Sequence, residues 1–114
     1  MRLFNSSKMK HLDIIEKKEN KLQFFSTGEI RYIGQILSHN SDHNGYEYTK
    51  IWMGDLEKEK INVKVSENGL IFIKFNVEDS DLLKNIEVKH EKCSLDKSEA
   101  VLYAGVLTIL TKFK

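Results

Sequence analysis

The sequence predicts an all-β fold, and a hairpin in the middle of the chain is the first reason. Apolar and polar residues alternate over 61–66, as they do in a half-buried strand. An apolar run follows over 70–75, and Asn68-Gly69 between the two runs is a strong signal for a tight hairpin turn. These three features together predict two antiparallel strands.

A strand near the end of the chain is the second reason. Gly105 can take the positive φ that a tight turn into a strand often requires. Beyond it, Leu107 and Ile109 fall on one face of an extended segment and Thr108 on the other. This segment is therefore predicted as a strand with one buried face.

Two longer stretches, one around each of these features, resemble the α-crystallin domain of small heat-shock proteins. The later stretch matches the segment that closes the sandwich of that family at eight positions, namely Asp96, Lys97, Ala100, Gly105, Val106, Leu107, Thr108 and Ile109. The earlier stretch resembles the family's Leu-Pro-Gly-Phe-Lys-Lys-Glu-Asp-Ile-Lys-Val segment through Met53, Leu56, Lys58, Glu59, Ile61 and Val63. The resemblance covers about residues 46–112.

The resemblance implies a fold and a function. The fold is an immunoglobulin-like antiparallel β-sandwich of the α-crystallin type. The function is ATP-independent binding of unfolded or extended polypeptide, which is the activity of a holdase chaperone in the stress response. The family's grooves between sheets and along edges imply client-binding or partner-binding residues at Ile71, Ile73, Leu82, Leu83, Leu107 and Ile109.

Two elements that build large assemblies in this family have no counterpart in the sequence. Only residues 76–85 separate Phe75 from Ile86, which is too short for a strand exchanged between subunits. The Ile-x-Ile/Val anchor of the family's C-terminal tail is also missing. We therefore expect a monomer or a small homo-oligomer such as a dimer. The alternative function is a β-sandwich interaction or structural module that binds one folded partner or assembles with itself.

The first part of the chain shows no resemblance to the family. Residues 1–45 are predicted as an N-terminal extension, β-rich or mixed, ahead of a sandwich domain over 46–114. Within it, Met9, Leu12 and Ile15 have helical spacing, so that 8–17 reads either as a short helix or as one strand of a hairpin.

Four further segments are predicted from their polarity. Residues 22–25 and Glu29 to Leu37 are expected to be extended. Ser38 to Gly45 is a polar loop and the most plausible boundary in the chain, and Tyr46 to Met53 follows as a strand.

Composition excludes several classes of protein. The net charge is +1, and charged residues of both signs, 31% of the chain, are mixed along it, so that neither nucleic acid nor a membrane surface is an expected partner. No apolar run approaches the roughly 18–20 residues of a membrane span. The single cysteine and the absence of a signal-peptide pattern predict a reducing, cytoplasmic location.

Residues that could support chemistry are few. His39, His43, His90 and Cys93 are zinc-ligand types, but their spacing matches no compact zinc module. Cys93 has no partner pattern for a nucleophile, and the acidic run over 78–81 lacks the pattern of a calcium loop. The sequence therefore predicts no enzyme, no cofactor and no metal.

Overall fold

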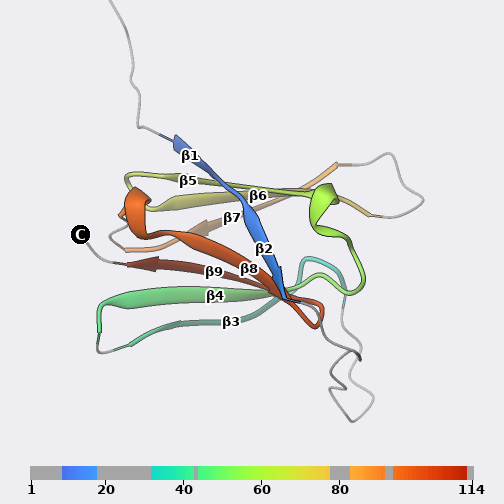
Figure 1. Cartoon of the computed structure of the whole chain (residues 1–114), viewed down its shortest axis with the longest axis horizontal. Helices are drawn as coiled ribbons and strands as arrows, with labels where there is room; N and C mark the ends of the chain where they lie inside the picture. The colour runs from blue at the N-terminus through green and yellow to red at the C-terminus, as the bar shows by residue number, and fades with distance from the viewer. Residues whose placement is uncertain (1–8, 18–31, 43, 78–82, 92–93, 113–114) are drawn as a thin grey trace, which may run out of the picture.

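The computed structural model describes residues 9–17, 32–42, 44–77, 83–91 and 94–112. These residues confirm the all-β prediction, because they form strands in two packed sheets with two short 3-10 helices (Figure 1). In chain order the elements are β1 (Met9–Leu12), β2 (Ile14–Lys17), β3 (Ile36–Ser41), β4 (Tyr46–Trp52), η1 (Lys58–Lys60), β5 (Ile61–Ser66), β6 (Leu70–Asn76), β7 (Leu83–Lys89), η2 (Leu95–Lys97), β8 (Glu99–Tyr103) and β9 (Val106–Lys112).

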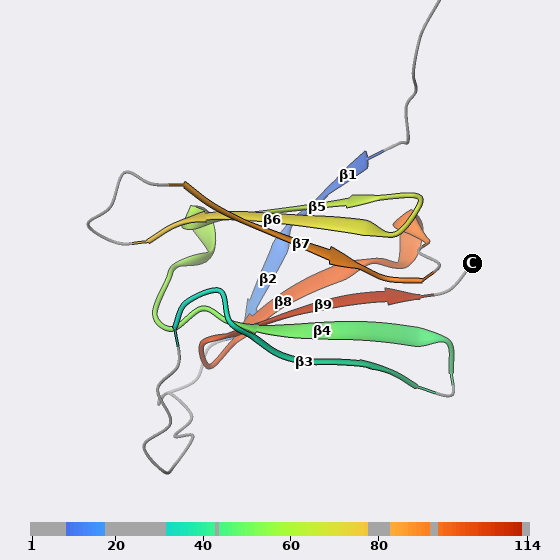
Figure 2. The same cartoon turned by 180° about the vertical axis from the view of Figure 1, so that it is seen from behind.

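The two sheets form the two layers of a sandwich. One sheet has the order β1-β5-β6-β7, and the other has the order β2-β8-β9-β4-β3. Front and back views show the layers facing each other (Figures 1 and 2). Every strand pairing among the described residues is antiparallel except that of β2 with β8. Only Asp13 separates β1 from β2, so the chain keeps its direction as it passes from one sheet to the other.

The predicted central hairpin is confirmed as β5 and β6. Its register pairs Ile61 with Phe75 and Val65 with Ile71. The turn is closed by the N–H of Gly69, which donates to the carbonyl oxygen of Ser66 over 3.0 Å. Gly69 has φ +94°, a conformation that favours glycine, which explains the Asn68-Gly69 signal.

The predicted closing strand is also confirmed. Gly105 has φ +82° in the turn between β8 and β9. Leu107 and Ile109 on β9 are fully buried, whereas Thr108 between them is only partly buried. The alternation of a half-buried strand is therefore present as expected.

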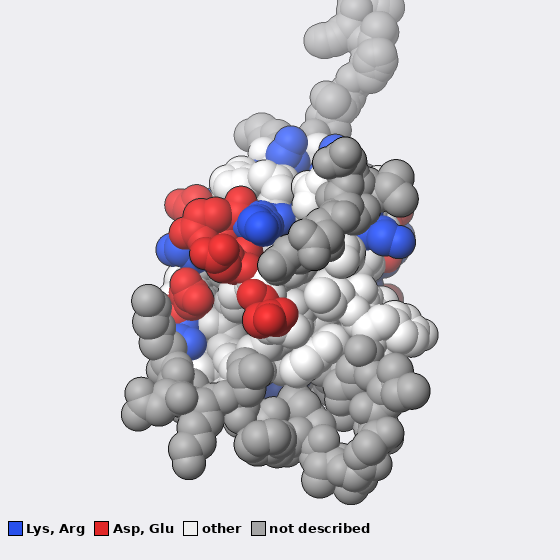
Figure 3. Space-filling view, turned by 90° about the vertical axis from the view of Figure 1, so that its right-hand side faces the viewer, with Lys and Arg blue, Asp and Glu red and all other residues white. Residues whose placement is uncertain are grey.

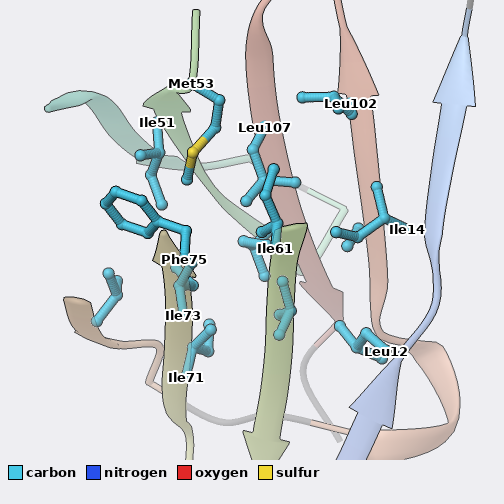
Figure 4. Packing of buried hydrophobic residues seen from close by; sticks show 14 of the residues in the cluster. Leu12, Ile14, Ile51, Met53, Ile61, Ile71, Ile73, Phe75, Leu102 and Leu107 are labelled. Carbon is cyan, nitrogen blue, oxygen red and sulfur yellow. The ribbon is translucent and has the colours of Figure 1, made fainter. Parts of the chain in front are cut away.

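The core lies between the sheets, and the described residues give it aliphatic side chains and one aromatic ring (Figure 4). β5, β6, β8 and β9 each contribute alternate residues, because successive side chains of a strand point to opposite faces. The buried apolar cluster consists of Leu12, Ile14, Ile51, Met53, Leu56, Ile61, Val63, Val65, Ile71, Ile73, Phe75, Val88, Ala100, Leu102, Leu107 and Ile109.

The N-terminal segment forms strands rather than the alternative short helix. A helix would place Met9, Leu12 and Ile15 on one face, yet Met9 and Ile15 are each 49% exposed. Leu12 and Ile14, on either side of Asp13, are buried instead, and both contribute to the core. The predicted strand over 22–25 lies outside the described residues. The division of the chain at residue 45 stays a prediction, although β1, β2 and β3 each pair with a strand from beyond it.

The prediction of a polar loop from Ser38 to Gly45 is wrong for its first half. β3 extends to Ser41 and pairs with β4 as the edge strand of the five-stranded sheet. A polar run is compatible with an exposed edge, where side chains remain in water. The turn begins at Asp42, whose carboxylate accepts the N–H groups of Asn44 and Tyr46 over 2.9 and 3.1 Å.

The extended segment predicted from Glu29 to Leu37 is only partly present. Residues 29–31 lie outside the described part of the chain. Residues 32–35 form a turn, in which the N–H of Gln35 donates to the carbonyl oxygen of Tyr32 over 3.0 Å. Gly34 in this turn has φ +97° and lies close to the Phe75 ring, so the chain bends here before β3 begins.

Candidate functional site

The free edge of β7 is the first candidate site. β7 is the last strand of its sheet. Its pairing with β6 extends from Leu70 opposite Lys89 to Asn76 opposite Leu83. On its other side no strand among the described residues pairs with it. An unpaired edge presents main-chain N–H and C=O groups that can pair with another extended chain.

A groove lies over β7 and its paired neighbour β6. Its volume is about 420 Å³, and its lining is Phe72, Ile73, Lys74, Leu83, Asn85, Ile86 and Glu87. Leu83 is 50% exposed, which few other large apolar side chains among the described residues are. Ile86 is partly buried against the core. The exposed apolar side chain of the groove, Leu83, therefore belongs to the strand that has the free edge.

The six residues predicted to bind a client or partner lie in different places. Ile71, Ile73, Leu107 and Ile109 have fully buried side chains between the sheets, so in this structure they contribute to the core. Leu83 is exposed at the start of β7 rather than within the predicted connection, and Leu82 lies outside the described residues. Ile73 on β6 and Leu83 on β7 both line the groove over these two strands, although the side chain of Ile73 is buried.

A cluster of three polar side chains, two of them buried, is the second candidate site. His39 on β3, Glu47 on β4 and His90 just after β7 have ligand-type atoms that all lie within 4.8 Å of one another. His39 Nε2 and Glu47 Oε2 are 2.6 Å apart. The rings of His39 and His90 are tilted by 33°, with their centroids 5.1 Å apart. We call these three residues the His–Glu cluster.

Further hydrogen bonds hold the cluster in place. The two ring nitrogens of His90 each meet a threonine hydroxyl, Nε2 at Thr49 over 2.8 Å and Nδ1 at Thr111 over 2.7 Å. The backbone N–H of Glu91 donates to Glu47 Oε1 over 2.7 Å. Both Glu47 and His90 are buried, and each of their polar side-chain atoms has a partner, as burial of such groups requires.

Burial determines the charge of His90. It lowers the pKa of His90 from its ordinary value of 6.5 to about 4, because the charged ring would lose its hydration. The carboxylate of Glu47 opposes this effect, and His39 adds to it. His90 is therefore neutral at pH 7.

Sequence reasoning found part of this cluster. The sequence offers His39 and His90 as zinc-ligand types but does not predict that they converge. Glu47, Thr49 and Thr111 were missed, although Glu47, Thr49 and Ile51 alternate along β4 and so share its inner face. His43, Cys93 and the acidic run over 78–81 lie outside the described residues.

On the face of the molecule that Figure 3 shows, acidic and basic side chains lie close together beside an uncharged area.

Among the described residues, no helix has the length and apolarity to cross a membrane. No model of a protein family and no curated protein matches the chain.

Proposed function

We propose that this protein binds unfolded or extended polypeptide along the free edge of β7, as an ATP-independent holdase of the small heat-shock type. The observation that carries the proposal is the edge itself. β7 has one side without a described partner strand, and the groove of about 420 Å³ over β6 and β7 contains the half-exposed Leu83.

Strand addition suits a binder of many clients. A client strand would form main-chain hydrogen bonds with β7 whatever its sequence, while alternate side chains of the client would lie beside Leu83. Covering the exposed half of Leu83 would contribute about 1 kcal/mol. A site of this kind selects extended chain over folded protein, which is the selectivity that a holdase needs.

The finer identification of the sandwich as an α-crystallin type is part of this proposal. Its support is the placement of the resembling stretches in the fold. The stretch from Met53 to Leu56 connects β4 in one sheet to β5 in the other, and the hairpin β5–β6 follows it. The stretch around Gly105 forms the turn between β8 and β9, which belong to the same sheet as β4.

One observation favours the alternative of an interaction module for a specific partner. β7 carries Lys84, Glu87 and Lys89, and charged side chains on an edge strand disfavour indiscriminate pairing. The groove is also small, with room for only a few side chains. A single partner segment of complementary charge would fit it.

Suppression of client aggregation tests the proposal. Light scattering of insulin reduced with dithiothreitol should fall when stoichiometric protein is added without nucleotide. Leu83→Ser should weaken this effect. Ile36→Ser is the matched control, because Ile36 is 48% exposed on β3 at an edge of the other sheet. Unchanged scattering with the wild-type protein would remove the holdase proposal and favour the specific-partner module.

A further inference from the structure

We propose that His39, Glu47 and His90 form a binding site for a divalent transition-metal ion such as Zn²⁺. The three side chains offer two imidazole nitrogens and a carboxylate oxygen within 4.8 Å of one another. Two histidines and one glutamate, with water as a fourth ligand, are a donor set that zinc uses in proteins. The proposal is independent of polypeptide binding at β7, because the cluster shares no residue with that groove.

The backbone fixes where the three ligands lie. β3 and β4 are paired, with His39 opposite Thr49 and Ser41 opposite Glu47, so His39 and Glu47 come from neighbouring strands. His90 follows β7, which belongs to the other sheet, and its N–H donates to the carbonyl oxygen of Gly69 over 2.8 Å. A metal ion here would therefore link both sheets.

The two buried ligands are oriented as metal ligands usually are. A metal-binding histidine normally has its second ring nitrogen hydrogen-bonded to another group. Thr111 provides this contact at Nδ1 of His90, which leaves Nε2 for the ion. The Glu91 N–H holds Oε1 of Glu47, and Oε2 is directed to His39.

Binding exchanges hydrogen bonds for metal bonds. The ion would replace the Thr49 hydroxyl as the partner of His90 Nε2, and it would separate His39 from Glu47. Zinc-to-nitrogen distances of about 2.0–2.1 Å require only small shifts within such a cluster. A dipositive ion would also compensate the charge of Glu47, whose side chain is only 8% exposed.

The ion has a route from solvent. The side chain of His39 is 41% exposed on the edge strand β3, whereas His90 has no exposed surface. His39 is therefore the ligand that borders solvent, and it is also the one whose removal disturbs the core least.

Titration of the full chain with Co²⁺ and Zn²⁺ tests the site. Co²⁺ should give the visible absorption bands of a tetrahedral site with one ion per chain, and Zn²⁺ should displace it and raise the melting temperature, because a ligand of the folded state alone stabilises it. His39→Ala should weaken metal binding by at least about tenfold. Even mutation of a residue that only hydrogen-bonds to a metal ligand lowers metal affinity about 10- to 100-fold. Glu47→Gln should do the same.

Matched controls separate this site from other metal-binding residues. His11 has a half-exposed side chain near Asp13, with their ligand-type atoms 3.8 Å apart, so His11→Ala removes a comparable surface histidine. His11→Ala, His43→Asn and Cys93→Ser should each retain binding. Circular dichroism should show that His39→Ala keeps its fold. No saturable binding by the wild-type protein, or equal binding by His39→Ala, would overturn the proposal and leave the cluster as a hydrogen-bonded network only.

Discussion

The backbone N–H of His90 donates a hydrogen bond to the carbonyl oxygen of Gly69 over 2.8 Å, and the carbonyl oxygen of His90 lies where a Cβ on Gly69 would be. The turn of the β5–β6 hairpin thus holds the segment in which the chain leaves one sheet for the other. Glycine is required at position 69 both for its positive φ and for this close approach.

Gly69→Ala should therefore destabilise the protein by about 2–4 kcal/mol, because it adds a clash with backbone to the strain of a positive φ. Gly54→Ala is the matched control. Gly54 has φ +60°, but a Cβ there would meet its neighbours only at 3.6 Å or more. Gly54→Ala should therefore cost about 1–2 kcal/mol, which is the strain of the positive φ without a clash. Urea melts of both variants measure the difference, and equal midpoints would show that Gly69 does not constrain His90.

Stability should fall in acid as His90 is forced to accept a proton. The pKa of His90 is about 4 when folded and 6.5 as the ordinary value. The unfolded chain therefore binds more protons between these values, and the stabilisation is complete above pH 6.5 and lost as pH falls to 4. The difference between these two pKa values corresponds to about 3 kcal/mol of folding stability, at 1.36 kcal/mol for each pKa unit.

Urea melts between about pH 4 and 7 measure this loss. His90→Asn removes the titrating ring, so its stability should vary less with pH in this window than that of the wild-type protein. A wild-type midpoint that stays constant from pH 6.5 to 4 would show that His90 is not protected from protonation.

The N-terminal segment should be part of the folded core. Leu12 is 4% exposed, so Leu12→Ala should cost about 2–3 kcal/mol, towards the lower end of the usual range for a buried leucine. Ile15→Ala, three residues further on at a side chain that is 49% exposed, should change stability by no more than about 0.5 kcal/mol. Equal, small effects in thermal melts would show that β1 and β2 do not pack on the sandwich.

The two sheets should depend on each other through the side chains between them. Leu107→Ala on β9 and Ile73→Ala on β6 each create a cavity at a fully buried position in opposite sheets. Each should cost about 2–5 kcal/mol in denaturant melts. Midpoints that do not move for either variant would show that these residues are not in the core.

The parts of the fold that could be predicted have strong local signals. Asn68-Gly69 and Gly105 mark turns by backbone conformation, and the strands beside them alternate apolar and polar residues. The segment around Leu12 and Ile14 has no such signal, because each of its strands has only four residues with one of them buried. Its place depends on the edges of β5 and β8, which are far away in the sequence.

The candidate sites were predictable only as residue types. The resemblance indicates Leu83 as a binding residue within the connection over 76–85, whereas it lies on β7, which pairs with β6. His39 was assigned to a loop because its strand is polar. The His–Glu cluster requires the pairing of β3 with β4 and the packing of the β7–β8 connection against them, and neither leaves a local pattern.

Hydrogen exchange of the full chain, with and without a permanently unfolded client, tests most directly whether the β7 edge binds polypeptide. Reduced and carboxymethylated α-lactalbumin is a suitable client, because it cannot refold. Amides of Leu83–Lys89 should exchange more slowly in its presence, as a client strand pairs with the edge, while amides of Ile36–Ser41 on β3 should not change. Unchanged exchange in β7 while the client is bound, or slowing confined to other strands, would contradict binding at this edge.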